Sequence, residues 1–190
     1  MAKQKTQASD ILLPLERLSR LMRAGEHEAG LNPAQWESLR YLARANRFSN
    51  SPGALTKFLG TTKGTISQTL KALERKGLIA KVPRQGEKRS VDLSLTSGGV
   101  TLLENDPLTE FSASVKELTP KTRRRLVKSL RELLTSELLR QDLPSFGICH
   151  TCRYFREDGA EDNLRGPHAC MLYEAPLSKR ETELVCVAHA

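Results

Sequence analysis

Two amphipathic helix patterns separated by only three residues restrict the folds open to this chain. The first pattern covers residues 52–59 and ends at Gly60, and the second covers about residues 63–76 and ends at Gly77. Glycine readily adopts the left-handed conformation that closes a helix. The second pattern places three apolar residues on one face, namely Ile66, Leu70 and Leu73. Two helices joined by so short a turn predict a helix-turn-helix.

A β-hairpin is predicted directly after the second helix. Residues 78–82 and 91–95 alternate apolar and polar side chains, as half-buried strands do. The loop between them is polar and basic, with Gly86 at its tip. A basic hairpin behind a helix-turn-helix makes the motif a winged one.

Further helices are predicted on the N-terminal side of this unit. Residues 9–24 show helical spacing after a cap signal at Ser9, so Pro14 is expected within the first turn. Asn32 and Pro33 are typical of the cap and first position of the next helix.

The segment after the hairpin also predicts helices. One starts at Thr96 or Ser97 and should be interrupted at Pro107, and another starts at Thr119 and Pro120. The last one carries a broad apolar stripe made of Leu126, Leu130, Leu133, Leu134 and Leu138. The stripe packs either inside its own domain or against another chain.

Charge is distributed unevenly along the 190 residues. The formal net charge is +8, and residues 141–190 hold 5 basic and 8 acidic residues, which leaves +11 for residues 1–140. A basic body favours a polyanionic partner such as nucleic acid. The chain shows neither a signal-peptide pattern nor an apolar run long enough for a membrane span, so a cytoplasmic protein without a membrane partner is expected.

Three motifs follow one another between residues 62 and 99. They are a polar helix ending in LERKGLI (residues 73–79), a loop with Glu87-Lys88-Arg89, and Leu95-Thr96 followed by Gly98 and Gly99. In this order they resemble the MarR family of winged-helix transcription regulators, and the resemblance spans about residues 8–141. Glu87 stands where the family usually has Asp, and Pro107 where it usually has an unbroken helix.

The resemblance implies a homodimer whose terminal helices form the interface. It also implies binding to pseudo-palindromic double-stranded DNA, a repressor role, and a crevice for a small-molecule effector. Two half-sites one helical turn apart would be read by two copies of the chain.

A recognition helix presents short polar side chains to base edges in the major groove. The predicted DNA-binding residues are Thr62, Lys63, Thr65, Ser67, Gln68 and Lys71 on the helix, with Arg84, Lys88 and Arg89 on the wing. Gln68 can pair bidentately with adenine, whereas Thr62 and Lys63 lie where a helix start favours phosphate. Arg89, held by Glu87, is expected in the minor groove.

All four cysteines lie within the last 42 residues. They are Cys149, Cys152, Cys170 and Cys186, spaced C-x2-C-x17-C-x15-C, with His189, His168 and His150 as reserve ligands. Thiols stay reduced in the cytosol, so the cluster favours metal or redox chemistry over disulfides. A tail with so few apolar groups needs such a centre to fold.

The sequence predicts one metal centre per chain and leaves its kind open. A structural Zn²⁺ site with four thiolates, or with His189 replacing one, is slightly favoured over an iron–sulfur cluster. The tail is faintly similar to high-potential iron–sulfur proteins, through Tyr154, Phe155 and the run Cys170-Met171-Leu172-Tyr173. A third possibility is four thiols without metal. Such a centre is either structural or a redox or metal sensor that acts through the neighbouring dimer helix.

The sequence thus predicts a mainly α protein with a small β wing (α+β) in two parts. Residues 1–141 form a MarR-like winged helix-turn-helix domain with terminal dimerisation helices, and residues 142–190 form a small cysteine-rich, metal-nucleated tail. No catalytic residue is predicted. The alternatives are a non-regulatory nucleic-acid-binding protein with a zinc tail and, least favoured because no catalytic motif is present, a metal-dependent enzyme using His168 and Glu157.

Overall fold

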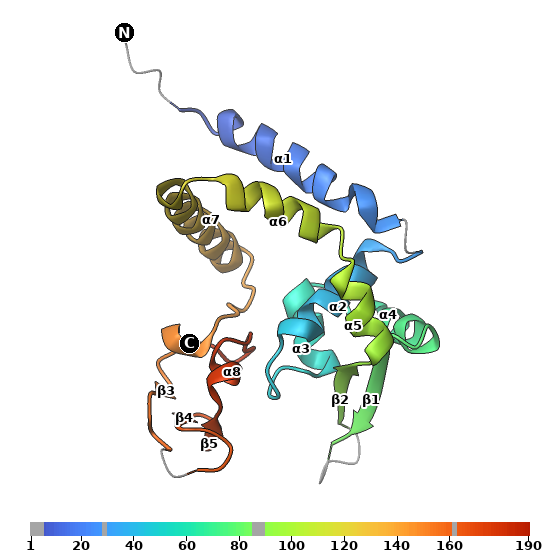
Figure 1. Cartoon of the computed structure of the whole chain (residues 1–190), viewed down its shortest axis with the longest axis vertical. Coiled ribbons are helices and arrows are strands. Elements are labelled where there is room, and N and C mark those ends of the chain that lie inside the picture. Colours follow the sequence, from blue (N-terminus) through green and yellow to red (C-terminus); the bar gives the residue numbers. More distant parts are fainter. Residues whose placement is uncertain (1–5, 28–29, 85–89, 161–162) are drawn as a thin grey trace.

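The computed structural model describes residues 6–27, 30–84, 90–160 and 163–190 (Figure 1). The N-terminal part of the chain, up to Arg140, runs α1 (Ser9–Ala24), η1 (Gly25–His27), α2 (Pro33–Arg44), α3 (Pro52–Leu59), α4 (Lys63–Arg75), β1 (Ile79–Pro83), β2 (Val91–Leu95), α5 (Ser97–Glu104), α6 (Leu108–Glu117) and α7 (Pro120–Arg140). The tail follows as η2 (Cys149–Thr151), β3 (Phe155–Arg156), β4 (His168–Cys170), β5 (Ala175–Leu177) and α8 (Lys179–Thr182). No helix in the described segments is long and apolar enough to cross a membrane.

The hydrophobic core lies among α2, α3, α4 and the β1–β2 hairpin. Trp36 and Leu39 of α2 and Leu55 of α3 are buried, together with the three inward residues of α4, Ile66, Leu70 and Leu73. The hairpin adds Ile79 and Leu93 to the same cluster. The predicted helix-turn-helix and its inward face are therefore confirmed.

Local cap signals set the helix boundaries of this core. Asn32, Ser51 and Thr62 each accept a hydrogen bond from the backbone N–H three residues on, which satisfies a donor that the first helical turn leaves unpaired. Gly60 and Gly77 adopt left-handed φ angles of 60° and 67° at the ends of α3 and α4. These starts and stops agree with the sequence prediction.

The wing is a two-stranded antiparallel hairpin. Its register pairs Ile79 with Leu95 at the base and Pro83 with Val91 near the tip. The Leu93 N–H donates to the backbone oxygen of Asn50 at 2.6 Å, which ties β2 to the segment between α2 and α3. Wing and helix-turn-helix thus form one packed unit, here called the winged unit (residues 30–104).

Helix α1 differs from its prediction at its start. Ala8 occupies the cap position, where no side chain caps the helix, and the Asp10 carboxylate accepts the N–H of Gln7. Pro14 is the sixth residue of α1, so the expectation that it lies in the first turn is wrong. A proline there removes one helical hydrogen bond. Because no residue of α1 is buried, the local change displaces no packed neighbour.

Three helices, called the helical arms (α1, α6 and α7), extend away from the winged unit (Figure 1). None of them contains a buried residue. Pro107 separates α5 from α6, as predicted. The arms expose large apolar side chains, among them Ile11, Leu12, Leu13, Leu18, Leu21, Leu126, Leu130, Leu133 and Leu134.

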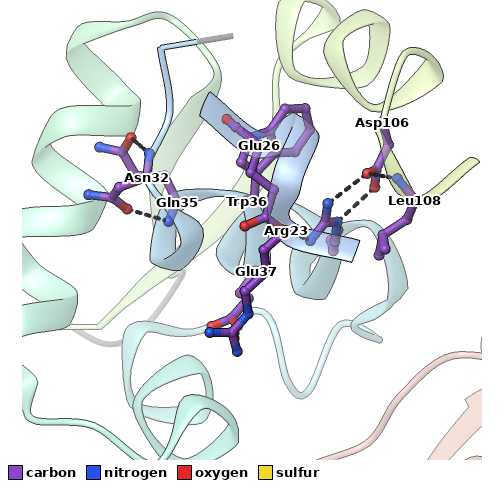
Figure 2. Close-up of polar contacts among 9 residues, drawn as sticks. Arg23, Glu26, Asn32, Gln35, Trp36, Glu37, Asp106 and Leu108 are labelled. Carbon is purple, nitrogen blue, oxygen red and sulfur yellow. Dashed lines mark hydrogen bonds and ion pairs between the residues drawn. The ribbon is translucent and has the colours of Figure 1, made fainter. Parts of the chain in front are cut away.

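A buried polar network joins the arms to the winged unit (Figure 2). The guanidinium of Arg40 in α2 donates to Glu26 in η1 at 2.6 Å and to both carboxylate oxygens of Asp106 at 2.7 and 2.8 Å. Asp106 also accepts the Leu108 N–H at 2.9 Å, and Trp36 Nε1 donates to the Glu26 backbone oxygen at 2.8 Å. Since η1 leads out of α1 and Asp106 leads into α6, one arginine holds the roots of two arms.

The tail packs onto the winged unit. Phe146, between α7 and η2, meets Phe58 edge-on at 4.9 Å between ring centroids and Tyr41 at 6.2 Å. Val185 and Val187 also pack against the main core. A small antiparallel sheet in the order β3-β4-β5 completes the tail. Its short strands were not predicted.

Candidate nucleic-acid interface and cysteine cavity

The outer face of α4 carries the predicted recognition residues together. Lys63, Thr65, Ser67, Gln68 and Lys71 are all exposed, while the intervening apolar residues face the core. No ion pair joins Lys63 or Lys71 to a carboxylate within the described part of the chain, so both ammonium groups are available to an anion. The helix therefore presents short polar groups and two cations on a rigid support.

Thr62 has a local role at the start of α4. Its Oγ1 accepts the N–H of Thr65 at 3.1 Å and lies 2.9 Å from the Thr65 hydroxyl. The cap orders the first turn, whose remaining N–H groups and helix dipole favour an anion. Thr62 thus sets the geometry of the phosphate position that the sequence predicted at this helix start.

Of the three predicted DNA-binding residues of the wing, only Arg84 is among the described residues. Lys88 and Arg89, with Glu87, lie outside the described residues. Arg84 donates from Nε and Nη2 to Asp92 Oδ1 at 3.0 and 2.5 Å. Arg84 is therefore engaged in an ion pair at the base of the loop, where it stabilises the hairpin rather than standing at its tip.

The ion pair between Arg40 and Asp106 favours the charged form of both side chains. Burial lowers the pKa of Arg40, but the hydrogen bonds and charges of Asp106 and Glu26 outweigh it and raise that pKa. Burial likewise raises the pKa of Asp106, and the Arg40 guanidinium with the Leu108 N–H brings it below its ordinary value. Glu26 Oε2 is buried without a hydrogen-bond partner. The ion pairs of Arg40 therefore hold the end of α1, through Glu26, and the start of α6, through Asp106, against α2.

The four cysteines meet at one cavity in the tail, called the thiol cavity. Cys149 and Cys152 come from η2 and its end, Cys170 from β4, and Cys186 from a short bridge to Gly147. Four aromatic side chains also line it, namely Phe48, Tyr154, Phe155 and Tyr173. All four thiols are free of disulfide bonds. The sequence prediction that these cysteines act together is consistent with this placement.

The thiols lie close enough to influence one another. Burial raises the pKa of Cys149 to about 11, and the neighbouring sulfurs of Cys186, Cys170 and Cys152 add to the shift. Yet in residues 6–27, 30–84, 90–160 and 163–190, no three His, Cys, Asp or Glu side chains form a group that could hold a metal ion. Metal binding by the tail stays a prediction.

The reserve histidine ligands point to other partners and do not line the cavity. His150 Nε2 lies 3.0 Å from Glu183 Oε1, and His189 Nε2 lies 2.9 Å from the Thr151 hydroxyl. His168 Nδ1 accepts the N–H of Asp158 at 3.2 Å. The cysteines are thus the cavity's metal-binding side chains among the described residues.

Sequence reasoning missed the part of the cavity that belongs to the winged unit. Asn46 and Phe48, from the segment between α2 and α3, line the cavity together with the cysteines. Phe48 stacks on Tyr173 with ring centroids 4.1 Å apart and an interplanar angle of 6°. No local pattern announces a contact between residues more than a hundred positions apart.

Comparison with known proteins supports the winged-helix architecture. Residues 29–90 match the family model of the MarR family. No curated protein matches the sequence. The matched residues include α2, α3, α4, β1 and the loop of the wing. The exposed face of α4 therefore lies inside the match.

Solved structures share the fold at low sequence identity. The S. aureus MepR–DNA complex matches with a TM-score of 0.54 and 23% identity over 70% of this chain and 99% of that chain. A cysteine-to-serine mutant of MarR from E. coli gives 0.53 and 22%, over 70% and 99%. NadR in complex with 4-hydroxyphenylacetate gives 0.53 and 22%, over 70% and 95%. At these identities the likeness establishes the winged-helix fold.

Proposed function

We propose that this chain is a sequence-specific DNA-binding transcription regulator of MarR type, a repressor that acts as a homodimer. The observation that carries the proposal is the exposed polar face of α4, held on a buried core beside a wing. The match to the MarR family model and the fold shared with a MepR–DNA complex support it.

Helix α4 has the chemistry that base recognition needs. Gln68 offers an amide that can pair bidentately with adenine, and Thr65 and Ser67 offer hydroxyls that accept or donate. Lys63, near the helix start, supplies the sequence-independent attraction to phosphate. Because Ile66, Leu70 and Leu73 anchor the opposite face, the reading face keeps its shape on the duplex.

The helical arms support the homodimer. A single chain leaves the apolar face of α7 exposed along 21 residues, and α1 is likewise uncovered. Contiguous apolar surface of this extent marks an interaction site in a water-soluble protein. A symmetric pair that buries the arms also places two copies of α4 on one duplex, as a pseudo-palindromic operator demands.

A small-molecule effector would act where the arms meet the winged unit. NadR, which shares the fold, was solved with 4-hydroxyphenylacetate. In this chain the Arg40 network is the rigid link between the two regions, so a ligand that shifts the arm roots would change the spacing of the two α4 helices.

The proposal extends to the tail. The thiols of Cys149, Cys152, Cys170 and Cys186 bind one metal centre per chain, which stabilises the tail or reports a change in its redox or metal surroundings. Their position around one cavity supports this reading.

Selection of bound sites from random duplexes, followed by footprinting, tests DNA recognition. We expect a pseudo-palindrome and a steep salt dependence of affinity. Gln68→Ala should cost about 1–3 kcal/mol and relax preference at one base pair per half-site, whereas Lys63→Ala should weaken all duplexes equally and reduce the salt slope by about 1. Gln7→Ala, just before α1, and Lys116→Ala, in α6, change exposed residues and serve as matched controls.

A chain that bound every duplex alike would instead be the non-regulatory nucleic-acid binder. Equal affinities for Gln68→Ala and Gln7→Ala would remove α4 from the role of recognition helix. Either result would contradict the proposal.

Sedimentation tests the dimer separately. Leu130→Glu with Leu134→Glu should convert the dimer into single chains, because two charges would have to enter an apolar interface. Arg131→Glu changes charge on an exposed position of the same helix and should leave the dimer intact. A wild-type chain that sediments as one copy at micromolar concentration would refute the homodimer.

A further inference from the structure

The thiol cavity has two features that the DNA-binding function does not require. It gathers every cysteine of the chain from three separate tail segments. It is also walled on one side by Asn46 and Phe48 of the winged unit, so whatever fills it touches the segment that leads into the helix-turn-helix.

We infer that the thiol cavity binds a cubane 4Fe–4S cluster through Cys149, Cys152, Cys170 and Cys186, and that the bound cluster holds the α2–α3 connection (residues 45–51) in place. This inference deepens the proposed function, and its effect on DNA binding rests on that function. The cluster site itself does not.

The arrangement of the thiols favours a cluster over one zinc ion. A tetrahedral zinc with Zn–S bonds of about 2.3 Å requires all four sulfurs within about 3.8 Å of one another. In the described segments no three His, Cys, Asp or Glu side chains form a group that could hold a metal ion. The sulfurs instead surround a cavity. A cubane has one iron at each of four corners, so its four thiolates bind around the cluster rather than at one point.

Ligand chemistry points the same way. A cubane takes four thiolates, and four thiols line the cavity. The three histidines do not line the cavity, and each contacts another group through one ring nitrogen, namely Glu183, the Thr151 hydroxyl and the Asp158 N–H. We therefore favour an iron–sulfur cluster over the zinc ion that the sequence slightly favoured.

The cavity wall suits a cluster that carries little charge for its size. Besides the cysteines, its lining consists of aromatic and aliphatic side chains and the amide of Asn46, and no Asp, Glu, Lys or Arg of the described residues belongs to it. Phe48 and Tyr173, which stack on each other, line it together with Tyr154 and Phe155. Apolar walls of this kind limit the access of water, which tunes and protects iron–sulfur clusters.

Binding balances as a ligand exchange without electron transfer. Each thiol loses its proton to solvent and forms one bond from Sγ to one iron, so four protons leave. A cubane core of charge 2+ and four thiolates give a complex of charge 2−.

Cys186 lies next to the backbone contacts that reach the winged unit. The N–H of Val185 donates to the Arg44 oxygen at 2.7 Å, and the Asn46 N–H donates back to the Val185 oxygen at 3.0 Å. One residue beyond Cys186, the Val187 N–H donates to Ser49 Oγ at 2.8 Å. A bond from iron to Cys186 therefore fixes an extended segment whose residues on either side, Val185 and Val187, are hydrogen-bonded to residues 44–49.

The same segment leads straight into the helix-turn-helix. Ser49 accepts the Tyr41 hydroxyl at 2.7 Å through its backbone oxygen, Asn50 accepts the Leu93 N–H from the wing, and Ser51 caps α3. Arg47 adds an ion pair to Glu181 of α8. Losing the cluster would release this segment, and with it the relative placement of α3, α4 and the wing.

Metal analysis of the full chain tests the site. After anaerobic purification, or reconstitution with iron and sulfide, we expect about four irons and four inorganic sulfides per chain and a brown colour. Cys170→Ala should abolish them, and Met171→Ala, an exposed neighbour, should not. Zinc at about one per chain that iron does not replace, or no metal after reconstitution, would overturn the inference. Fluorescence of Trp36, the chain's one tryptophan, reports whether each variant keeps its winged core.

Amide exchange tests the coupling without DNA. Removing the cluster, or Cys170→Ala, should speed exchange in residues 45–51 and leave α7 unchanged. If the proposed function holds, DNA affinity should also fall about tenfold. Unchanged exchange in residues 45–51 would overturn the coupling. A cluster-dependent change in exchange in a chain that binds no DNA would instead refute the proposed function and leave the cluster site standing.

Discussion

The winged unit and the helical arms use similar sequence patterns to opposite effect. Helix α4 has 13 residues and buries Ile66, Leu70 and Leu73 within its own chain. Helix α7 has 21 residues with leucines at the same kind of spacing, yet none of them is buried. The difference lies in what each helix packs against, because α4 meets α2, α3 and β1 whereas the arms extend away from the core.

The comparison separates two sources of stability. A buried apolar side chain contributes about 1.5–3 kcal/mol relative to an exposed one, so the winged unit is stabilised by its own residues. The arms obtain such a contribution only from a second surface. We therefore expect the winged unit to be stable at any protein concentration and the arms to depend on concentration.

The largest expected effect concerns Arg40, which joins the two regions. Arg40→Met leaves the carboxylates of Glu26 and Asp106 buried without their partner and should cost about 3–5 kcal/mol. Arg23→Met is the matched control, because Arg23 lies 3.9 Å from Glu37 with both side chains largely exposed, and should cost less than about 1 kcal/mol. Urea unfolding followed by circular dichroism measures both.

Equal losses in the two variants would show that the Arg40 network does not link the regions. Neutralising the partners sharpens the test. Adding Glu26→Gln and Asp106→Asn to Arg40→Met should recover part of the loss, since the triple variant leaves no unpaired buried charge.

The next effect compares one leucine from each region. Leu70→Ala, at 2% exposure, should cost about 2–5 kcal/mol whatever the protein concentration. Leu13→Ala, at 63% exposure, should cost under about 0.5 kcal/mol in dilute protein and more as concentration rises. Unfolding at two protein concentrations decides between these outcomes. A Leu13→Ala cost that ignores concentration would mean that α1 packs against no second chain.

Local signals predicted the winged unit well. Gly60, Gly77, Ser51 and Asn32 each act within a few residues of their own position, so the sequence alone was sufficient to place the helix ends. Pro14 was misplaced because an exposed helix tolerates a defect that a buried helix would not.

Contacts between distant segments could not be predicted. Nothing near Phe48 indicates that Tyr173 will stack on it, and nothing near Val185 indicates a bridge to Ala45. The cysteine spacing suggested a shared site, and the structure places the four cysteines at one cavity; that the α2–α3 connection lines the same cavity was not predictable. Coupling of the tail through α7, expected from its position in the sequence, stays a prediction.

Helix caps give a smaller effect that sharpens the comparison. Ser51→Ala and Thr119→Ala each remove an N-cap hydrogen bond worth about 0.5–2 kcal/mol. Loss of the Ser51 cap should lower the global free energy of unfolding, because α3 belongs to the packed core. Loss of the Thr119 cap should chiefly speed amide exchange in the first turn of α7. Equal changes in global stability would place α7 in the same cooperative unit as the core.

The last prediction concerns acid pH. Protonation of Asp106 should weaken its ion pair with Arg40, an effect that is absent at neutral pH. The pKa of Asp106 is lowered in the folded chain, because the Arg40 guanidinium and the Leu108 N–H outweigh the effect of burial. A lowered folded pKa means that the contribution is complete above the ordinary aspartate value of about 3.9 and is lost as the pH falls below it. Stability of the wild type should therefore drop in this acid range more steeply than that of Asp106→Asn, which has no carboxylate to protonate. Urea titrations between about pH 6 and about pH 3 measure the difference, and parallel pH profiles would show that Asp106 does not fasten the arm to the winged unit.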